Sequence, residues 1–338
     1  MYVSLNDTHV SNETTNHMLP SIILGFCFLV GAPGNALVIG VILSQTKRLT
    51  FTLRLIANLA VTDLLALLVL PFWIYALVDS WIYGWLGCKI LSFVVYCSMY
   101  ASIFSVLMLS LHRCVLVLAP LWRWKSKGVK LGNRQSGCLL AGLWCASALL
   151  TVPVLEPRSV MLRDGRFSCI ASAYTSRAHE VALLLLETLL GFVIPFLVIA
   201  ISYCLISKRI TERGFLWRRR LTRLTAWIVF TFFIFWFPYH LVNLVKVGAM
   251  LRLSNSEELH IPSVWVNAAG ALTFINSCLN PFIYAFTTIR PRKDTHDQST
   301  WKQLCQSCWS QLREDLPSQI GSEESRKAAV RRADSSNS

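Results

Sequence analysis

Two carboxylates lie inside long apolar stretches of this 338-residue chain. Seven long runs of the sequence are hydrophobic, and Asp63 and Glu187 are the only formal charges within them. A carboxylate in an apolar environment is costly unless a partner, an ion or a ligand satisfies it. Each carboxylate therefore indicates a candidate site, and polar residues at the same depth are its candidate neighbours.

The seven runs are long enough to be transmembrane helices, because about 20 apolar helical residues cross the hydrocarbon layer of a bilayer. Of all residues, 54% are hydrophobic and only 15% are charged, which leaves too little polar surface for a water-soluble domain. We predict an all-α membrane protein, a seven-transmembrane helix bundle. Its spans are expected at 21–43, 55–78, 90–111, 137–155, 181–206, 224–245 and 262–289.

The loop charges predict the orientation of the bundle. Fourteen Lys and Arg residues fall in the loops of one side and seven in those of the other. Because basic loops stay cytoplasmic, the N-terminus is expected outside and the C-terminus inside, as in a multi-pass plasma-membrane protein. Glycosylation sequons at Asn6 and Asn12 agree with this. The net charge of +14 lies in loops and tail that face anionic lipid and cytosolic partners, so we expect no nucleic-acid partner.

The first polar layer lies on the cytosolic side of the middle of the bundle. Asp63, Asn35, Ser102 and Asn280 are each 8 or 9 residues from the inner end of their span, a depth of about 12 to 14 Å. A carboxylate among amide and hydroxyl oxygens could hold a small hard cation such as sodium. A hydrogen-bonded packing cluster with protonated Asp63 explains the depths equally well.

The second polar layer lies about 8 to 9 Å below the outer ends of the helices. It contains Tyr96, Glu187, Tyr239, His240 and Asn267, with Tyr100 about a turn deeper. Glu187 must face the interior, where His240 or a ligand hydroxyl could satisfy it. We interpret the layer as a pocket that opens outward, the alternative being ordinary interior packing. Prolines that kink helices make room for such a cavity, and they occur at Pro71, Pro153, Pro195, Pro238 and Pro281.

Cysteines and the C-terminal segment complete the predicted organisation. Cys88 and Cys169 face the oxidising side, so we expect a disulfide between them. After the last span, apolar residues at helical spacing predict a short membrane-surface helix, with Cys305 and Cys308 as palmitoylation candidates. We divide the chain into a glycosylated extracellular tail (1–20), the bundle (21–289), a juxtamembrane amphipathic helix (290–314) and a disordered, phosphorylatable cytoplasmic tail (315–338).

Short motifs occur in a fixed order along the seven runs. They are Gly34-Asn35, Asn58-Leu59-Ala60 with Asp63, Trp144, Pro195 with Tyr203, Trp236 with Pro238, and Asn280-Pro281-Phe282-Ile283-Tyr284. With them the chain resembles the rhodopsin-like (class A) G-protein-coupled receptors over nearly all of its length. The resemblance implies no enzymatic activity and no cofactor beyond an allosteric sodium ion at Asp63, Ser102, Asn276 and Asn280. It also implies that Arg113 contacts the G protein and that Tyr203, Trp236 and Tyr284 act in switching.

Within that family the chain looks like the leukotriene B4 receptors. The stretches that carry this are Ser98-Met99-Tyr100-Ala101-Ser102, Pro153-Val154-Leu155-Glu156-Pro157-Arg158, Glu187 ahead of Gly191-Phe192-Val193-Ile194-Pro195-Phe196, and Phe235-Trp236-Phe237-Pro238-Tyr239-His240-Leu241-Val242-Asn243-Leu244. The implied agonist is a hydroxylated lipid acid, with Arg158 for its carboxylate and Glu187, Tyr239 and His240 for its hydroxyls. The implied pocket also includes Met99 and Asn243. An inhibitory-class G protein, arrestin and receptor kinases are the implied partners, and leukocyte chemotaxis and inflammation the implied setting.

The inner end of the third span departs from the family pattern. The family usually has an acid before the helix 3 arginine, whereas here the triplet is His112-Arg113-Cys114. Arg218 is basic where many relatives carry an acid, so the clamp on Arg113 is in doubt.

Several other functions compete with a receptor. A transporter would show inverted repeats or a chain of membrane charges. A retinal photoreceptor would need a lysine in 262–289, and a membrane enzyme would show a metal or nucleophile motif. A chemoattractant peptide receptor is the serious alternative.

Overall fold

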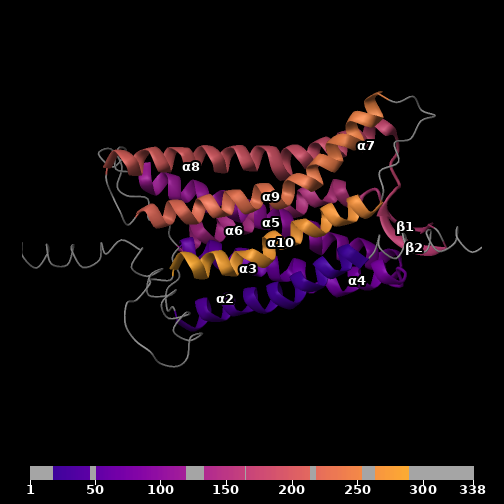
Figure 1. Ribbon diagram of the computed structural model, residues 1–338, viewed down its shortest axis with the longest axis horizontal. Helices are drawn as coiled ribbons and strands as arrows, with labels where there is room; N and C mark the ends of the chain where they lie inside the picture. Colours follow the sequence, from indigo (N-terminus) through magenta and orange to yellow (C-terminus); the bar gives the residue numbers. More distant parts are fainter. Residues whose placement is uncertain are drawn as a thin grey trace, which may run out of the picture. The chain divides into compact units, whose positions relative to one another are not determined.

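The computed structural model describes residues 18–45, 51–118, 133–163, 165–213, 218–252 and 263–288. Its first compact unit runs from Met1 to Ile283, and the second, Tyr284–Ser338, is described only as the end of a helix through Thr288. In the first unit the helices run roughly side by side along the long axis (Figure 1).

The helices form seven successive segments in the described residues. The first consists of helical residues 18–26, the π-helical turn η1 (Cys27–Gly31) and α2 (Ala32–Gln45), and the second of α3 (Phe51–Leu68) and α4 (Leu70–Val78). Then follow α5 (Gly84–Leu118) and α6 (Asn133–Leu155). The fifth contains α7 (Arg177–Thr188), η3 (Leu189–Val193) and α8 (Ile194–Arg213). The last two are α9 (Arg218–Arg252) and α10 (Ser263–Thr288).

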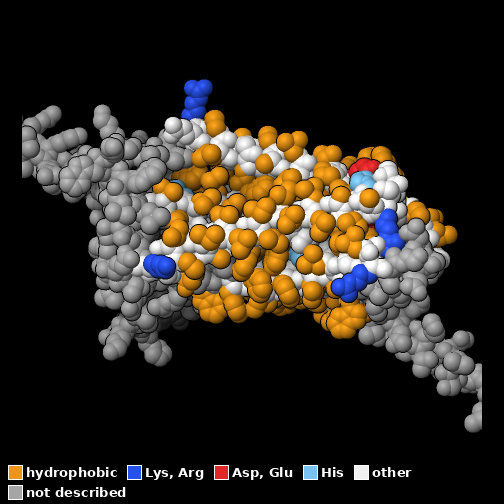
Figure 2. Space-filling view, turned by 90° about the horizontal axis from the view of Figure 1, so that it is seen from above, with side chains coloured by type: hydrophobic (Ala, Val, Ile, Leu, Met, Phe, Trp, Pro, Cys, Tyr) orange, Lys and Arg blue, Asp and Glu red, His pale blue; other side chains and the backbone are white. Residues whose placement is uncertain are grey.

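Length and composition identify these segments as membrane spans. In the described part, six of them contain apolar windows long enough to cross a bilayer. The seventh, α10, has 26 residues and no Asp, Glu, Lys or Arg. Figure 2 shows a broad band of hydrophobic side chains across one face, with several Lys and Arg side chains toward its ends. The predicted seven-helix fold is confirmed, and α5 extends beyond the predicted run 90–111 at both ends.

Irregular turns occur near several of the predicted prolines. The second span breaks at Val69, two residues before Pro71, and η3 ends two residues before Pro195. Pro153, Pro238 and Pro281 lie inside α6, α9 and α10. The π-helical turns η1 and η3 were not predicted; each changes the direction in which the following side chains point.

A β-hairpin between α6 and α7 lies at one end of the bundle (Figure 1). Strands β1 (Arg158–Arg163) and β2 (Arg166–Ala171) pair antiparallel, with Val160 opposite Cys169. Gly165 has a φ of 75° at the turn, a conformation that glycine adopts without strain. The sequence predicts only a loop here, because strands this short depend on tertiary contacts more than on local pattern.

Candidate functional site: an outer pocket and an inner polar layer

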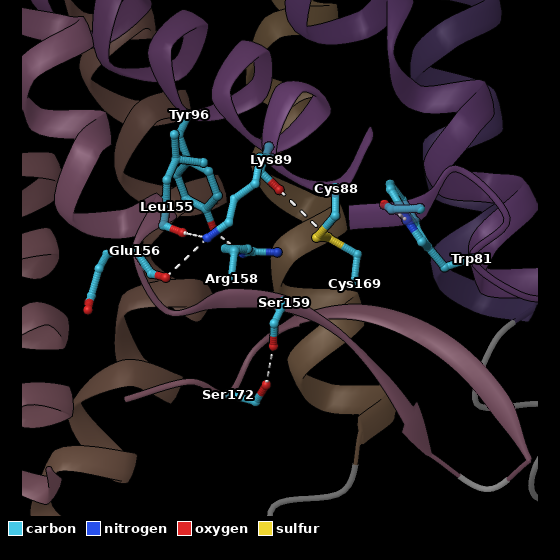
Figure 3. The surroundings of a disulfide bond; sticks show 12 residues. Trp81, Cys88, Lys89, Tyr96, Leu155, Glu156, Arg158, Ser159, Cys169 and Ser172 are labelled. Atoms are coloured by element: carbon cyan, nitrogen blue, oxygen red, sulfur yellow. Dashed lines mark hydrogen bonds between the residues drawn. A yellow bond between two sulfur atoms is a disulfide. The ribbon is translucent and has the colours of Figure 1, made fainter. Parts of the chain in front are cut away.

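The outer loop is fixed to the bundle by a disulfide. Cys88 of α5 and Cys169 of β2 form the predicted bond, with Cα atoms 5.6 Å apart (Figure 3). Both cysteines are buried with Trp81, whose backbone N–H donates to the Phe167 carbonyl at 2.8 Å. The disulfide is confirmed, and the hydrogen bond is a second attachment of the hairpin.

The base of the hairpin is held by polar contacts that the sequence did not indicate. Lys89 donates from Nζ to the carbonyls of Leu155 and Glu156, at 2.6 and 3.1 Å (Figure 3). These carbonyls end α6, where a cation is favourable. The Pro157 carbonyl accepts hydrogen bonds from the backbone N–H groups of Ser172 and Ala173 at 2.9 and 3.0 Å. Together these contacts close the base of the hairpin and fix where Arg158 begins β1.

Arg158 is directed toward the third span. Its Nη2 donates to the hydroxyl of Tyr96, and its guanidinium carbon lies 5.1 Å from the centre of the Tyr96 ring (Figure 3). Its Nε is buried and has no hydrogen-bond partner in the described part of the chain. A buried donor without an acceptor is costly, so an anion or a polar oxygen bound beside this nitrogen would be stabilised.

Glu187 receives hydrogen bonds from α9, but from different residues than expected. Tyr239 donates its hydroxyl to Oε1 at 2.8 Å, and Asn243 lies at the long limit, 3.5 Å from Oε2. His240, offered by the sequence as a partner, instead places Nδ1 3.4 Å from the Thr188 hydroxyl. Neighbouring helical residues point about 100° apart, so Tyr239 and His240 cannot both face Glu187.

His240 packs its ring against a buried aromatic cluster. Its ring lies 4.9 Å from that of Phe192 and 5.9 Å from that of Trp236, both nearly parallel to it. Tyr100, Phe192 and Trp236 belong to one buried cluster, against which Met99 packs. Tyr96, Met99 and Tyr100 of α5 therefore lie in or against this cluster, whereas Glu187 is on α7 and Arg158 begins β1. Asn267 lies half-buried on α10, and no described hydrogen bond joins it to them.

The inner layer gathers around Asp63, which is fully buried. Ser102 donates to Oδ1 at 3.1 Å and Asn280 to Oδ2 at 2.6 Å, while Asn276 is buried on the same helix as Asn280. Asn35 differs from expectation, because its amide donates to the carbonyls of Gly31 and Ser277. In the described part no Lys or Arg ion-pairs with Asp63, so a carboxylate with only neutral hydrogen-bond partners fits a sodium ion or a proton.

At the cytosolic end, His112 contacts two residues of α3. His112 Nδ1 lies 3.5 Å from the Thr52 hydroxyl, and its ring meets that of Phe51 edge-on at 5.0 Å. Arg113 beside it is buried. Tyr203 is half-buried on α8, and Tyr284 lies in α10.

A half-buried hydrogen-bonded bridge joins the second, third and fourth spans. Asn58 donates to Ser105 at 2.8 Å and accepts from the indole of Trp144 at 2.9 Å, which brings together two motifs singled out in the sequence. The family described as 7 transmembrane receptor (rhodopsin family) matches residues 34–284. The chain belongs to this family. It is a G-protein-coupled receptor and a multi-pass membrane protein, not an enzyme.

Two kinds of known receptor are similar to this one in sequence. The receptor is 35% identical over 273 residues to human (Homo sapiens) leukotriene B4 receptor 1, covering 79% of this chain and 76% of that one. Identity to the Mus musculus protein of that name is 36% over 271 residues, with the same coverage. It is also 31% identical over 287 residues to human N-formyl peptide receptor 2, covering 81% and 80%. A lipid receptor and a peptide receptor thus both resemble this one.

Several predicted sites lie outside the described residues. They are the sequons Asn6 and Asn12, the palmitoylation candidates Cys305 and Cys308, and the segments 290–314 and 315–338. They stay predictions, as do the domain boundaries drawn from them.

We expect sodium to lower agonist affinity through Asp63. If the ion favours the resting bundle, raising sodium at constant ionic strength should weaken agonist binding by about fivefold, the low end of typical allosteric coupling. Asp63→Asn removes the charge and should abolish this sensitivity. The measurement is agonist binding to membranes in sodium or in a large organic cation. A mutant that responds like the parent would show that the cluster is structural packing.

Proposed function

We propose that this receptor responds at the plasma membrane to leukotriene B4 or a closely related hydroxylated lipid acid, and that it activates an inhibitory-class G protein. The observation that carries the proposal is Arg158, a guanidinium held over Tyr96 whose buried Nε has no hydrogen-bond partner among the described residues. A lipid carboxylate is an acceptor of suitable charge and geometry for this group.

The rest of the pocket suits the remainder of such a ligand. Glu187 is an acceptor to which a ligand hydroxyl can donate, either together with Tyr239 or in its place. Buried His240 has an Nε2 without a partner in the described residues, a second polar group for a hydroxyl. Rings of Phe192 and Trp236 offer apolar surface to a hydrocarbon chain. These features favour a long amphipathic acid.

Signalling partners follow from the family. A shift of the bundle on agonist binding would expose Arg113 to the G protein, with Trp236, Tyr203 and Tyr284 as the switching residues. Arrestin and receptor kinases would act on the C-terminal tail. Leukocyte chemotaxis and inflammation are the proposed setting.

Nucleotide exchange on G proteins in membranes that contain the receptor tests the proposal. Leukotriene B4, its methyl ester, other oxidised fatty acids and N-formyl peptides are compared at equal receptor density. We expect leukotriene B4 to be the strongest agonist and its uncharged ester to be weaker, since the ester lacks the charge that Arg158 would bind. A peptide that outperforms every lipid, or an ester as potent as the acid, would contradict the lipid-acid proposal.

A further inference from the structure

A histidine and a carboxylate meet on the outer surface, at the junction between α6 and α7. His179 Nε2 lies 3.4 Å from Glu156 Oε2, and the two side chains are 27% and 49% exposed. Glu156 directly follows α6, and His179 is in the first turn of α7. The pair therefore connects two spans that the hairpin otherwise separates in sequence.

The other imidazole nitrogen is also fixed. His179 Nδ1 lies 2.9 Å from the Thr175 hydroxyl, and the backbone N–H of His179 donates to Ser176, the N-cap of α7. Zinc-bound histidines usually have the second ring nitrogen hydrogen-bonded to an oxygen, which fixes the orientation of the ring. The contact thus orients Nε2 toward Glu156.

The separation of the two ligand atoms agrees with metal coordination. Zinc binds imidazole nitrogen at about 2.0 to 2.1 Å and carboxylate oxygen at about 2.0 to 2.2 Å, so two tetrahedral ligands lie about 3.4 Å apart. Nε2 and Oε2 have this separation without any movement. Their exposure leaves room for water ligands, and imidazole favours zinc over magnesium or calcium.

The neighbouring groups limit what the site can be. Tyr174 packs its ring edge-on at 6.2 Å from His179. The described residues contain no group of three or more His, Cys, Asp or Glu side chains around one metal position, which excludes a closed structural zinc site there.

We propose that Glu156 and His179 form an open, two-residue zinc site, completed by water, on the extracellular surface of this receptor. Zinc bound there would tie the end of α6 to the start of α7. Arg158 lies two residues from Glu156 and shares the hairpin base that Lys89 and Pro157 close. The bound ion would therefore restrain the hairpin base next to the guanidinium, a form of regulation that goes beyond the proposed agonist.

The test is metal binding by the full receptor in lipid nanodiscs, which needs no agonist. Cobalt(II), a spectroscopic substitute for zinc, should give visible absorption bands that added zinc removes. The parent should bind one more zinc ion per receptor than His179→Gln or Glu156→Gln. Thr175→Val keeps the shape but loses the hydroxyl, and it should bind zinc about tenfold more weakly. Glu180→Gln, a neighbouring acid outside the pair, is the control and should bind like the parent.

Equal zinc uptake by the parent and His179→Gln, with both proteins showing the same thermal unfolding curve, would overturn the proposal. The pair would then be only a hydrogen bond or ion pair between α6 and α7. Loss of zinc binding in Glu180→Gln as well would also overturn the two-residue assignment. Neither outcome depends on which agonist activates the receptor, so failure of the zinc site and failure of the lipid-acid proposal are distinguishable.

Discussion

We expect Arg158→Ala to lower the potency of a lipid-acid agonist by about 5-fold to 150-fold, equivalent to about 1 to 3 kcal/mol. The loss is large because a ligand carboxylate in the pocket would lose a charge-assisted donor, and water cannot fully replace it there. Dose-response curves of nucleotide exchange measure the effect. Tyr96→Phe removes only the hydroxyl that accepts from Nη2, so it should cost less than loss of the guanidinium.

A matched control comes from the same hairpin. Arg166 is exposed and donates to the Val78 carbonyl at 3.3 Å, so Arg166→Ala removes a hairpin cation that does not face Tyr96. It should leave agonist potency unchanged. If Arg158→Ala and Arg166→Ala reach the surface normally and respond alike, the carboxylate does not bind at Arg158.

Glu187→Gln tests the other half of the same pocket. The substitution keeps the shape but removes the charge that accepts from Tyr239 and Asn243. We expect a loss of about 1 to 3 kcal/mol, because ligand hydroxyls would exchange a charged acceptor for a neutral one. Normal surface expression with unchanged potency in both Glu187→Gln and Arg158→Ala would contradict the lipid-acid pose.

The sequence predicted the spans because the bilayer imposes one strong rule on composition. Every span must be apolar and helical, so residues such as Asp63 and Glu187 stand out and their depth can be counted. The meeting of Ser102 and Asn280 at Asp63 followed from that count. Depth gives no rotation about the helix axis, however, which is why Asn35 was grouped with Asp63 although it bonds to backbone carbonyls.

Details outside regular helices were less predictable. The π-helical turn η3 directly after Glu187 and Thr188 has no simple local signature, and neither does the pairing of β1 with β2. The hydrogen-bond partners of Glu187 could not be predicted from the sequence, because Tyr239 and His240 are adjacent and depth alone does not tell which of them faces Glu187. The Glu156–His179 contact joins residues from the two sides of the hairpin, so only the folded loop brings them together.

Basal signalling should reflect His112, which stands where the family resemblance leads us to expect an acid. An acid there would pair with Arg113 and hold it in the resting state, whereas histidine supplies no negative charge. In the structure His112 packs instead against Phe51 and Thr52 of α3. The receptor should therefore signal measurably without agonist. Adding back about 1.4 kcal/mol of restraint would change the ratio of resting to active forms tenfold.

His112→Asp should accordingly lower agonist-free nucleotide exchange by up to about tenfold at equal surface expression, while agonist still reaches a comparable maximum. His112→Asn is the matched control, because it has nearly the same shape as aspartate without the charge and loses the same ring contact with Phe51. A reduction by aspartate alone would assign the effect to charge beside Arg113. An equal reduction by asparagine would assign the effect to packing against α3. Unchanged basal exchange in both variants would show that other groups hold Arg113, and Tyr203 and Tyr284 would be the first of these to test.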